Sequence, residues 1–118
     1  MIIAIPVDDN KTDVCVSLGR TPYFLIHDTE TSITKFEINP GATAEGGAGL
    51  ASAQLLLDQS IDTLITVRCG QNAADVLQEA AIKIYKSIPA NAEENLKALS
   101  AGTLEILAHF HAGFHGIQ

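Results

Sequence analysis

The chain contains no tryptophan, and aromatic residues make up only 5% of its 118 residues. Its core must therefore be built mainly from Leu, Ile, Val and Ala, within a hydrophobic content of 47%. A chain of this length is expected to form one domain and to bury roughly 65% of the surface that its unfolded form exposes. No repeat, linker or second domain is visible in the sequence.

Basic residues are also scarce. The chain has seven Lys and Arg residues and fourteen Asp and Glu residues, which gives a formal net charge of −7. Nucleic acids and anionic membranes both bind clustered basic side chains, so we expect neither partner. No apolar run approaches the ~20 residues of a membrane-spanning helix. The run at residues 2–7 lacks the length and the basic start of a secretion signal, which predicts a cytoplasmic protein.

Only two cysteines are present, Cys15 and Cys69. In a cytoplasmic protein both are expected to be reduced thiols. The spacing of two cysteines does not decide whether they pair, so a disulfide between them stays open at this point.

Several catalytic and nucleotide-binding motifs are missing. The sequence has no G-x-x-x-x-G-K-[ST], no dinucleotide-binding glycine pattern, no G-x-S-x-G and no H-E-x-x-H. A two-metal hydrolase needs carboxylates at the ends of central strands. Asp8 or Asp9 could be one, but Arg68 and Cys69 occupy the matching place after the strand predicted at 61–67. We therefore expect a binding protein rather than an enzyme, with a metal-dependent hydrolase as the weaker alternative.

Hydrophobic patterning predicts an α/β fold. Apolar and alternating runs predict strands, and the short polar turn at 29–32 makes the second and third strands an antiparallel hairpin. Strands are expected at 2–7, 22–28, 33–38, 61–67 and 82–88. Helices are expected at 49–59, at 73–81 with Asn72 as N-cap, and at 91–100, followed by a short turn at 103–107. This order predicts a mixed five-stranded sheet with helices on its faces, as one domain over 1–108 with a tail at 109–118.

Two glycine-rich turns each lead from a loop or strand into a predicted helix. They are Glu45-Gly46-Gly47-Ala48-Gly49 and Arg68-Cys69-Gly70-Gln71-Asn72. A helix N-terminus carries unpaired N–H groups and a partial positive charge, so it suits an anion. We expect both turns to meet at one rim, together with Asp8–Asn10 after the first strand. The alternative is that the glycines only make tight turns.

Single residues in these loops add candidate ligands. Arg20 and Arg68 both lie near glycine in loops of an otherwise acidic chain. Beside Arg68 and a helix start, Cys69 is placed to lose its proton and bind a soft metal; the alternative is a buried apolar cysteine. Cys15 is a possible second ligand, or it packs with its neighbours.

The tail carries His109, His111 and His115 in the pattern H-x-H-x3-H. Imidazole nitrogens bind zinc, copper, nickel and iron, so three in one short segment are a candidate metal site. The alternative is a mobile polar chain end with incidental metal affinity.

The order of several segments resembles the dinitrogenase iron–molybdenum cofactor biosynthesis family, the small NifX-like proteins. The matching segments are 2–6, 18–24, 46–50 with Ala53 and Gln54, 70–73 with Leu77, 82–85, and Glu93 with Glu94. The resemblance implies a ribonuclease-H-like three-layer fold. By position it implies a site made of Arg20, Gly46, Gly47, Gly49, Gly70 and Asn72. Leu18 and Gln71 depart from the family pattern, the cysteines are not general features of it, and the histidine tail lies outside the match.

The resemblance also implies a function. Family members bind or carry iron–sulfur, iron–molybdenum or related molybdenum–sulfur clusters. We therefore expect a carrier of a metal–sulfur cluster or precursor, with cluster donor and acceptor proteins as partners. The alternative is an interaction module that partners a cluster-assembly ATPase.

Overall fold

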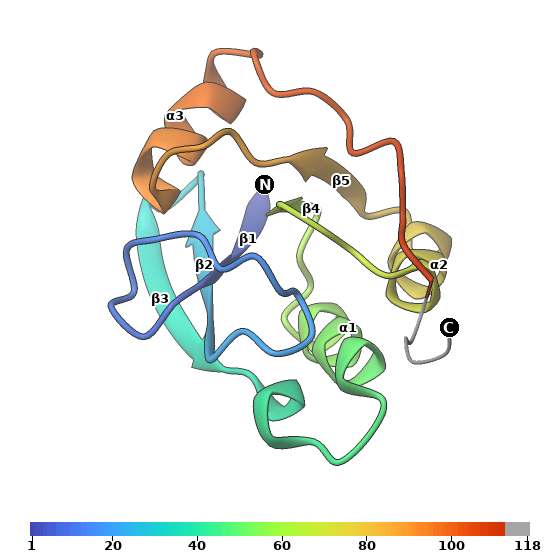
Figure 1. The fold of residues 1–118 in the computed structure, drawn as a ribbon. Coiled ribbons are helices and arrows are strands. Elements are labelled where there is room, and N and C mark those ends of the chain that lie inside the picture. Colours follow the sequence, from blue (N-terminus) through green and yellow to red (C-terminus); the bar gives the residue numbers. More distant parts are fainter. Residues whose placement is uncertain (113–118) are drawn as a thin grey trace.

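The computed structural model describes residues 1–112 and contains one mixed sheet (Figure 1). The strands are β1 (Ile2–Val7), β2 (Tyr23–Asp28), β3 (Ile33–Ile38), β4 (Thr63–Thr66) and β5 (Lys83–Lys86). The helices are η1 (Pro40–Thr43), α1 (Ala48–Asp58), α2 (Gln71–Glu79) and α3 (Ala92–Ser100). The longest of these helices has 11 residues, so no helix in the described part of the chain could span a membrane.

The strand order is β3-β2-β1-β4-β5. β1 pairs antiparallel with β2 and parallel with β4, β2 pairs antiparallel with β3, and β4 pairs parallel with β5. This confirms the predicted hairpin and the mixed five-stranded sheet. β1 lies at the centre, which explains why its sequence is a continuous apolar run.

Both faces of the sheet are covered. Successive side chains of β1 point to opposite faces, so Ala4 packs under α1 and α2 while Ile3 and Ile5 pack on the opposite side. α1 and α2 share one core with Phe24 and Leu64 of the sheet. α3 contributes to the other core through Ala92, Leu96 and Leu99. The fold is therefore α/β with helices on both faces; its ribonuclease-H-like name remains an implication of the resemblance.

The start of α2 differs from the prediction. Asn72 was expected to be the N-cap, but the N-cap is Gly70 and the helix begins at Gln71. The Gly70 carbonyl accepts the first helical bond from Ala74 N at 2.9 Å, and no side chain caps this end. Asn72 is therefore the second residue of the helix. The cap predicted for α3 is confirmed, since Asn91 accepts from Glu94 N at 2.8 Å.

The segment after α3 also differs from the prediction. Gly102, with φ +75°, follows the end of α3, and the expected helical turn at 103–107 does not form. The chain instead runs along β5: Lys86 N donates to Glu105 O at 2.7 Å, and Leu107 N donates to Ile84 O at 2.9 Å. This pairing carries the chain from α3 toward the start of α2 (Figure 1).

Candidate anion-binding cleft

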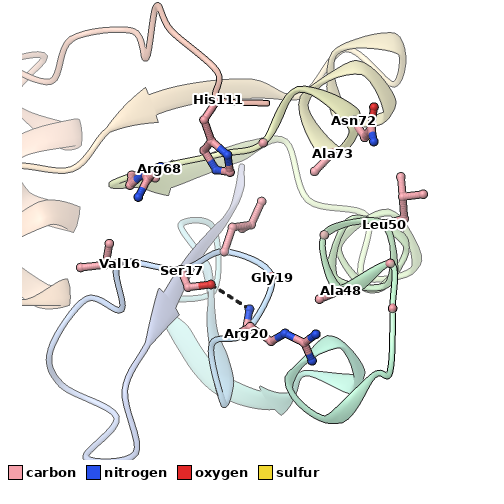
Figure 2. Close-up of a pocket in the computed structure, with 15 residues that line it drawn as sticks. Val16, Ser17, Gly19, Arg20, Ala48, Leu50, Arg68, Asn72, Ala73 and His111 are labelled. Atoms are coloured by element: carbon pink, nitrogen blue, oxygen red, sulfur yellow. Dashed lines mark hydrogen bonds between the residues drawn. The ribbon is translucent and has the colours of Figure 1, made fainter. Parts of the chain in front are cut away.

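The two glycine-rich turns open onto one cleft of about 530 Å³ (Figure 2). Its walls come from the loop at 16–20, the turn and first helical residues at 46–50, and the link from β4 to α2. The C-terminal segment adds His111. The cleft has the size of a small-ligand pocket, and it lies where strands end and helices begin, the usual ligand site of open α/β sheets.

The third predicted wall is wrong. Asp8–Asn10 does not line the cleft in the described structure. This loop closes on itself, because Asp8 N donates to Asp13 O at 2.9 Å and the Asn10 side chain accepts from Thr12 N and Asp13 N. The chain then returns, and the later part of the same connection, from Val16 to Arg20, forms the wall instead.

Both helix N-termini at the cleft lack a side-chain cap. The first-turn residues of α1 that line the cleft are Ala48, Gly49 and Leu50, and those of α2 are Asn72 and Ala73. None of these five N–H groups has a backbone acceptor within residues 1–112. Together with the two helix dipoles they form a site suited to negative charge.

The two helix starts lie side by side. A Cβ added at Gly49 would lie 3.7 Å from the Cβ of Ala73. Gly19 packs on the same corner, where an added Cβ would lie only 3.1 Å from Gly49 N. These glycines let the loop and both helices approach closely, and a larger side chain at Gly19 would press on the turn that exposes the N–H groups.

The two arginines differ in their contacts. Arg20 Nη1 donates to Ala44 O at 2.6 Å and to Gly41 O at 3.2 Å, so its side chain ties η1 and the following segment to the cleft wall. Arg68 is exposed, and although its backbone carbonyl accepts from Thr66 Oγ1 at 3.1 Å, its guanidinium makes no hydrogen bond or ion pair with any residue in 1–112. Arg68 is therefore the guanidinium available to a ligand.

A buried polar network that the sequence did not reveal holds the cleft floor. Asn39 is 1% exposed and donates to Gly19 O at 3.1 Å and to Thr21 O at 2.9 Å. Its carbonyl oxygen accepts from Gly41 N and from Ser52 Oγ, both at 3.0 Å. The available signal was the Asn-Pro-Gly turn, but turn chemistry alone does not indicate that Asn39 is buried or reaches α1.

Cys69 does not take the predicted role. It is 1% exposed, belongs to the core under α1 and α2, and does not line the cleft. Burial raises the pKa of its thiol from 9.0 to about 12, because desolvation disfavours the thiolate. The burial favours the apolar alternative: Cys69 lies outside the cleft lining and faces only the smaller neighbouring pocket.

Cys15 is half-buried, and it too lies outside the cleft lining. Burial raises the pKa of its thiol; smaller contributions come from hydrogen bonds with Ser17 and Thr21, which lower the pKa, and from Asp8, which raises it. Both cysteines are free thiols in the structure, so no disulfide joins them.

The two described histidines share one pocket, but only one of them reaches the cleft. His109 and His111 both line a smaller neighbouring pocket of about 250 Å³, and His111 lines the cleft as well. His115 lies outside the described residues, so the three-histidine site remains a prediction. Within residues 1–112, no three His, Cys, Asp or Glu side chains are grouped to hold a metal ion.

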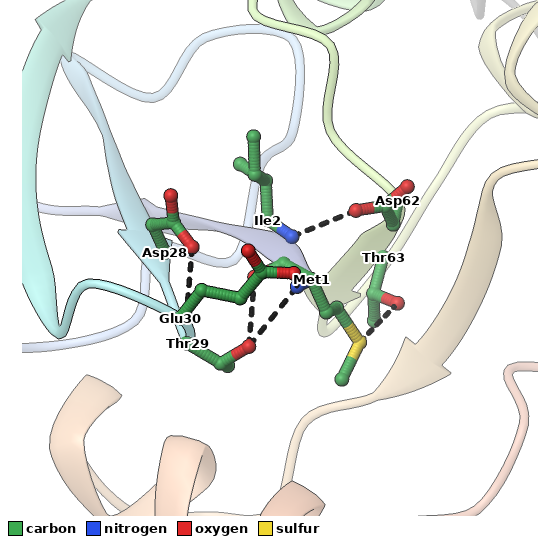
Figure 3. Close-up of polar contacts among 7 residues, drawn as sticks. All are labelled: Met1, Ile2, Asp28, Thr29, Glu30, Asp62 and Thr63. Atoms are coloured by element: carbon green, nitrogen blue, oxygen red, sulfur yellow. Dashed lines mark hydrogen bonds and ion pairs between the residues drawn. The ribbon is translucent and has the colours of Figure 1, made fainter.

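Carboxylates gather at the opposite end of β1 from the cleft (Figure 3). Asp62 accepts from Ile2 N at 2.8 Å, and Glu30 forms an ion pair of 4.0 Å with the N-terminal amine. These contacts hold the first strand in place. The cleft lining in the described residues contains two arginines, one histidine and no carboxylate.

Comparisons with known proteins agree with the resemblance. A family model described as dinitrogenase iron-molybdenum cofactor matches residues 1–102. An uncharacterized protein of Methanocaldococcus jannaschii is 30% identical over 108 residues, which is 89% of this chain and 90% of the relative.

Two solved structures share the fold. The apo form of the orange protein from Desulfovibrio gigas has a TM-score of 0.83 and 25% identity, over 91% of this chain and 92% of that one. A Thermotoga protein provisionally assigned as NifB has a TM-score of 0.78 and 30% identity, over 96% of this chain and 98% of that one. The chain therefore belongs to the dinitrogenase iron-molybdenum cofactor family.

Proposed function

We propose that this protein binds an anionic metal–sulfur cluster, or a precursor of one, in the cleft and carries it during cofactor assembly in the cytoplasm. The observation that carries the proposal is a cleft whose lining, within residues 1–112, has five unpaired helix N–H groups and no carboxylate, in a chain of net charge −7. The family's link to the iron–molybdenum cofactor supplies the class of anion.

The donor set fits an anion held without thiolate bonds. N–H groups and the Arg68 guanidinium donate to the negative surface sulfurs of a cluster, and charge-assisted hydrogen bonds of this kind are the strong ones. Loss of two helix-end interactions and one guanidinium contact releases the cluster, so transfer to an acceptor protein needs no covalent step. Iron–sulfur, iron–molybdenum and molybdenum–sulfur clusters all satisfy this chemistry.

A carrier role agrees better with the cleft than an enzymatic role does. General acid–base or two-metal chemistry needs carboxylates or other proton-transfer groups at the reacting atoms. Among the described lining residues, His111 has the one imidazole, and no carboxylate stands beside it. An interaction module for a cluster-assembly ATPase is the second candidate, and the exposed Ile33 and Ile38 of edge strand β3 are the surface that favours it.

The test is metal and sulfide analysis of the protein purified without oxygen and then reconstituted with iron, sulfide and molybdate. We expect stoichiometric metal with a coloured absorption spectrum, and the same loading for Cys69→Ala, because that thiol lies outside the cleft. No retained metal, together with co-purification of an ATPase, would replace the carrier by the interaction module. Loss of loading in Cys69→Ala with an unchanged fold would show that the assigned ligand set is wrong.

A further inference from the structure

The C-terminal segment places a histidine into the cleft from outside the family-matched region, which ends at residue 102. Its backbone is fixed on both sides: His111 N donates to Cys69 O at 3.2 Å, and Gln71 N donates to His111 O at 2.8 Å. This parallel bridge opposite Gly70 joins the segment to the start of α2. His111 is therefore held in position as a cleft wall.

The imidazole ring lies against Gly70. A Cβ at Gly70 would come within 3.3 Å of the ring atom Cε1 and 3.7 Å of Nε2. The absence of a side chain there lets the ring approach the helix start closely. Figure 2 shows the ring directed into the cleft, between the end of β4 and the loop that carries Ser17.

The ring's hydrogen bond fixes which nitrogen carries the proton. His111 Nδ1 lies 2.9 Å from Ala112 O, and a carbonyl oxygen only accepts. In the neutral ring Nδ1 therefore carries the proton, and Nε2 keeps a free lone pair. A histidine whose other nitrogen donates to a backbone carbonyl is the usual arrangement of a metal ligand.

The cleft offers no better ligand for a metal of intermediate softness. Among the described residues the cleft lining holds no thiol, because Cys69 is buried and lines only the smaller neighbouring pocket, while Ser17 and Asn72 supply only hard oxygen donors. Imidazole suits iron, copper, nickel and zinc. Resting on the proposed function, we propose that His111 Nε2 coordinates a metal ion of the bound cluster, while the N–H groups and Arg68 hold its sulfurs.

His109 supplies a matched control. It lies two residues earlier in the same segment, is exposed, and lines the smaller pocket rather than the cleft. Replacement of His109 by alanine removes the same side chain from the same segment without touching the cleft.

The experiment uses full-length protein with ¹⁵N-labelled histidine, reconstituted anaerobically with ferrous iron and sulfide and then reduced to a paramagnetic state. Pulsed electron paramagnetic resonance detects a histidine nitrogen bound to the cluster. We expect this coupling in wild type and His109→Ala and its loss in His111→Ala, with metal retention after desalting lowered about tenfold or more in His111→Ala. Circular dichroism confirms that each variant is folded.

The outcomes separate the two proposals. Loading of wild type with no histidine coupling, or with a coupling that persists in His111→Ala, overturns the coordination by His111 and leaves the carrier function standing. A wild-type protein that retains no metal overturns both. For the unloaded protein, ¹⁵N shifts showing Nε2 rather than Nδ1 protonated would also contradict the coordination geometry.

Discussion

At the residue scale, Arg20 and Arg68 line one cleft but make different contacts. The Arg20 guanidinium donates to Gly41 O and Ala44 O, whereas the Arg68 guanidinium has no partner within the described residues 1–112. Arg68→Ala should therefore leave the free energy of unfolding within about 0.5 kcal/mol and weaken anion binding about tenfold. Arg20→Ala should lower the free energy of unfolding by about 1 kcal/mol, because it removes the hydrogen bonds to Gly41 O and Ala44 O.

Urea unfolding and equilibrium binding of tetrathiomolybdate, a sulfur-covered dianion, measure both quantities for each variant. Arg68→Lys is the control, because it keeps the charge but not the forked geometry, and it should fall between wild type and Arg68→Ala. Equal effects of Arg20→Ala and Arg68→Ala on both quantities would contradict the division of roles.

Cys69 gives a second prediction at this scale. Because burial raises its pKa to about 12, the thiol should resist iodoacetamide in the native protein near pH 8 and react once the chain is unfolded. Mass spectrometry of native and denatured samples measures this. Rapid native alkylation of Cys69 would show that the thiol is accessible and ionised after all.

The same shift predicts a pH dependence of stability. The folded state holds the proton more tightly than the unfolded chain, so this thiol's stabilising contribution is complete below about pH 9 and is lost as pH rises toward about 12. The unfolding free energy of wild type should therefore fall relative to Cys69→Ala between about pH 8 and about pH 11. A constant difference across that range would contradict the raised pKa.

The residues of the site were partly predictable from the sequence. Glycine-rich turns before helices can be recognised locally in a sequence. Five residues predicted in this way do lie at the cleft, namely Gly46, Gly47, Gly49, Gly70 and Asn72. The burial of Cys69 and the network around Asn39 could not be predicted, because both depend on which distant segments pack over them.

At the scale of elements, one substitution at the uncapped start of α2 should have opposite effects on helix stability and on anion binding. Asn72→Asp adds a negative charge in the first turn of α2, which should stabilise the helix by about 0.5 kcal/mol through its dipole. The same charge lies in the cleft and should weaken tetrathiomolybdate binding several-fold.

Gln78→Glu is the matched control, since it makes the same amide-to-carboxylate change at the far end of the same helix. It should leave binding nearly unchanged and slightly lower stability. Thermal unfolding and binding titrations test the pair, and a binding loss of similar size in both variants would point to net charge rather than to the helix start.

Element prediction succeeded where the pattern is local. Six-residue strands 2–7 and 33–38 and the cap of α3 follow from apolar runs, alternation and the Asn91 signal. The segment at 103–107 was mispredicted because its backbone hydrogen bonds go to β5, about twenty residues earlier in the chain. Such long-range pairing overrides local helix propensity.

At the scale of the whole molecule, the cleft carries local positive charge although the net charge of the chain is negative. Carboxylates such as Asp62 and Glu30 lie at the far end of β1, and the cleft carries N–H groups and arginines. The overall charge of −7 discourages non-specific anions, while the local field of the cleft attracts one that fits it. Four separate segments of the chain thus build one anion-binding cleft.

The most direct measurement is a titration of ¹⁵N-labelled protein with tetrathiomolybdate, followed by amide chemical shifts. We expect saturable shifts with one shared dissociation constant for the first-turn amides of both helices, namely Ala48, Gly49, Leu50, Asn72 and Ala73. Shifts confined to one helix start, or to lysines elsewhere on the surface, or shifts that do not saturate, would contradict a shared anion-binding cleft.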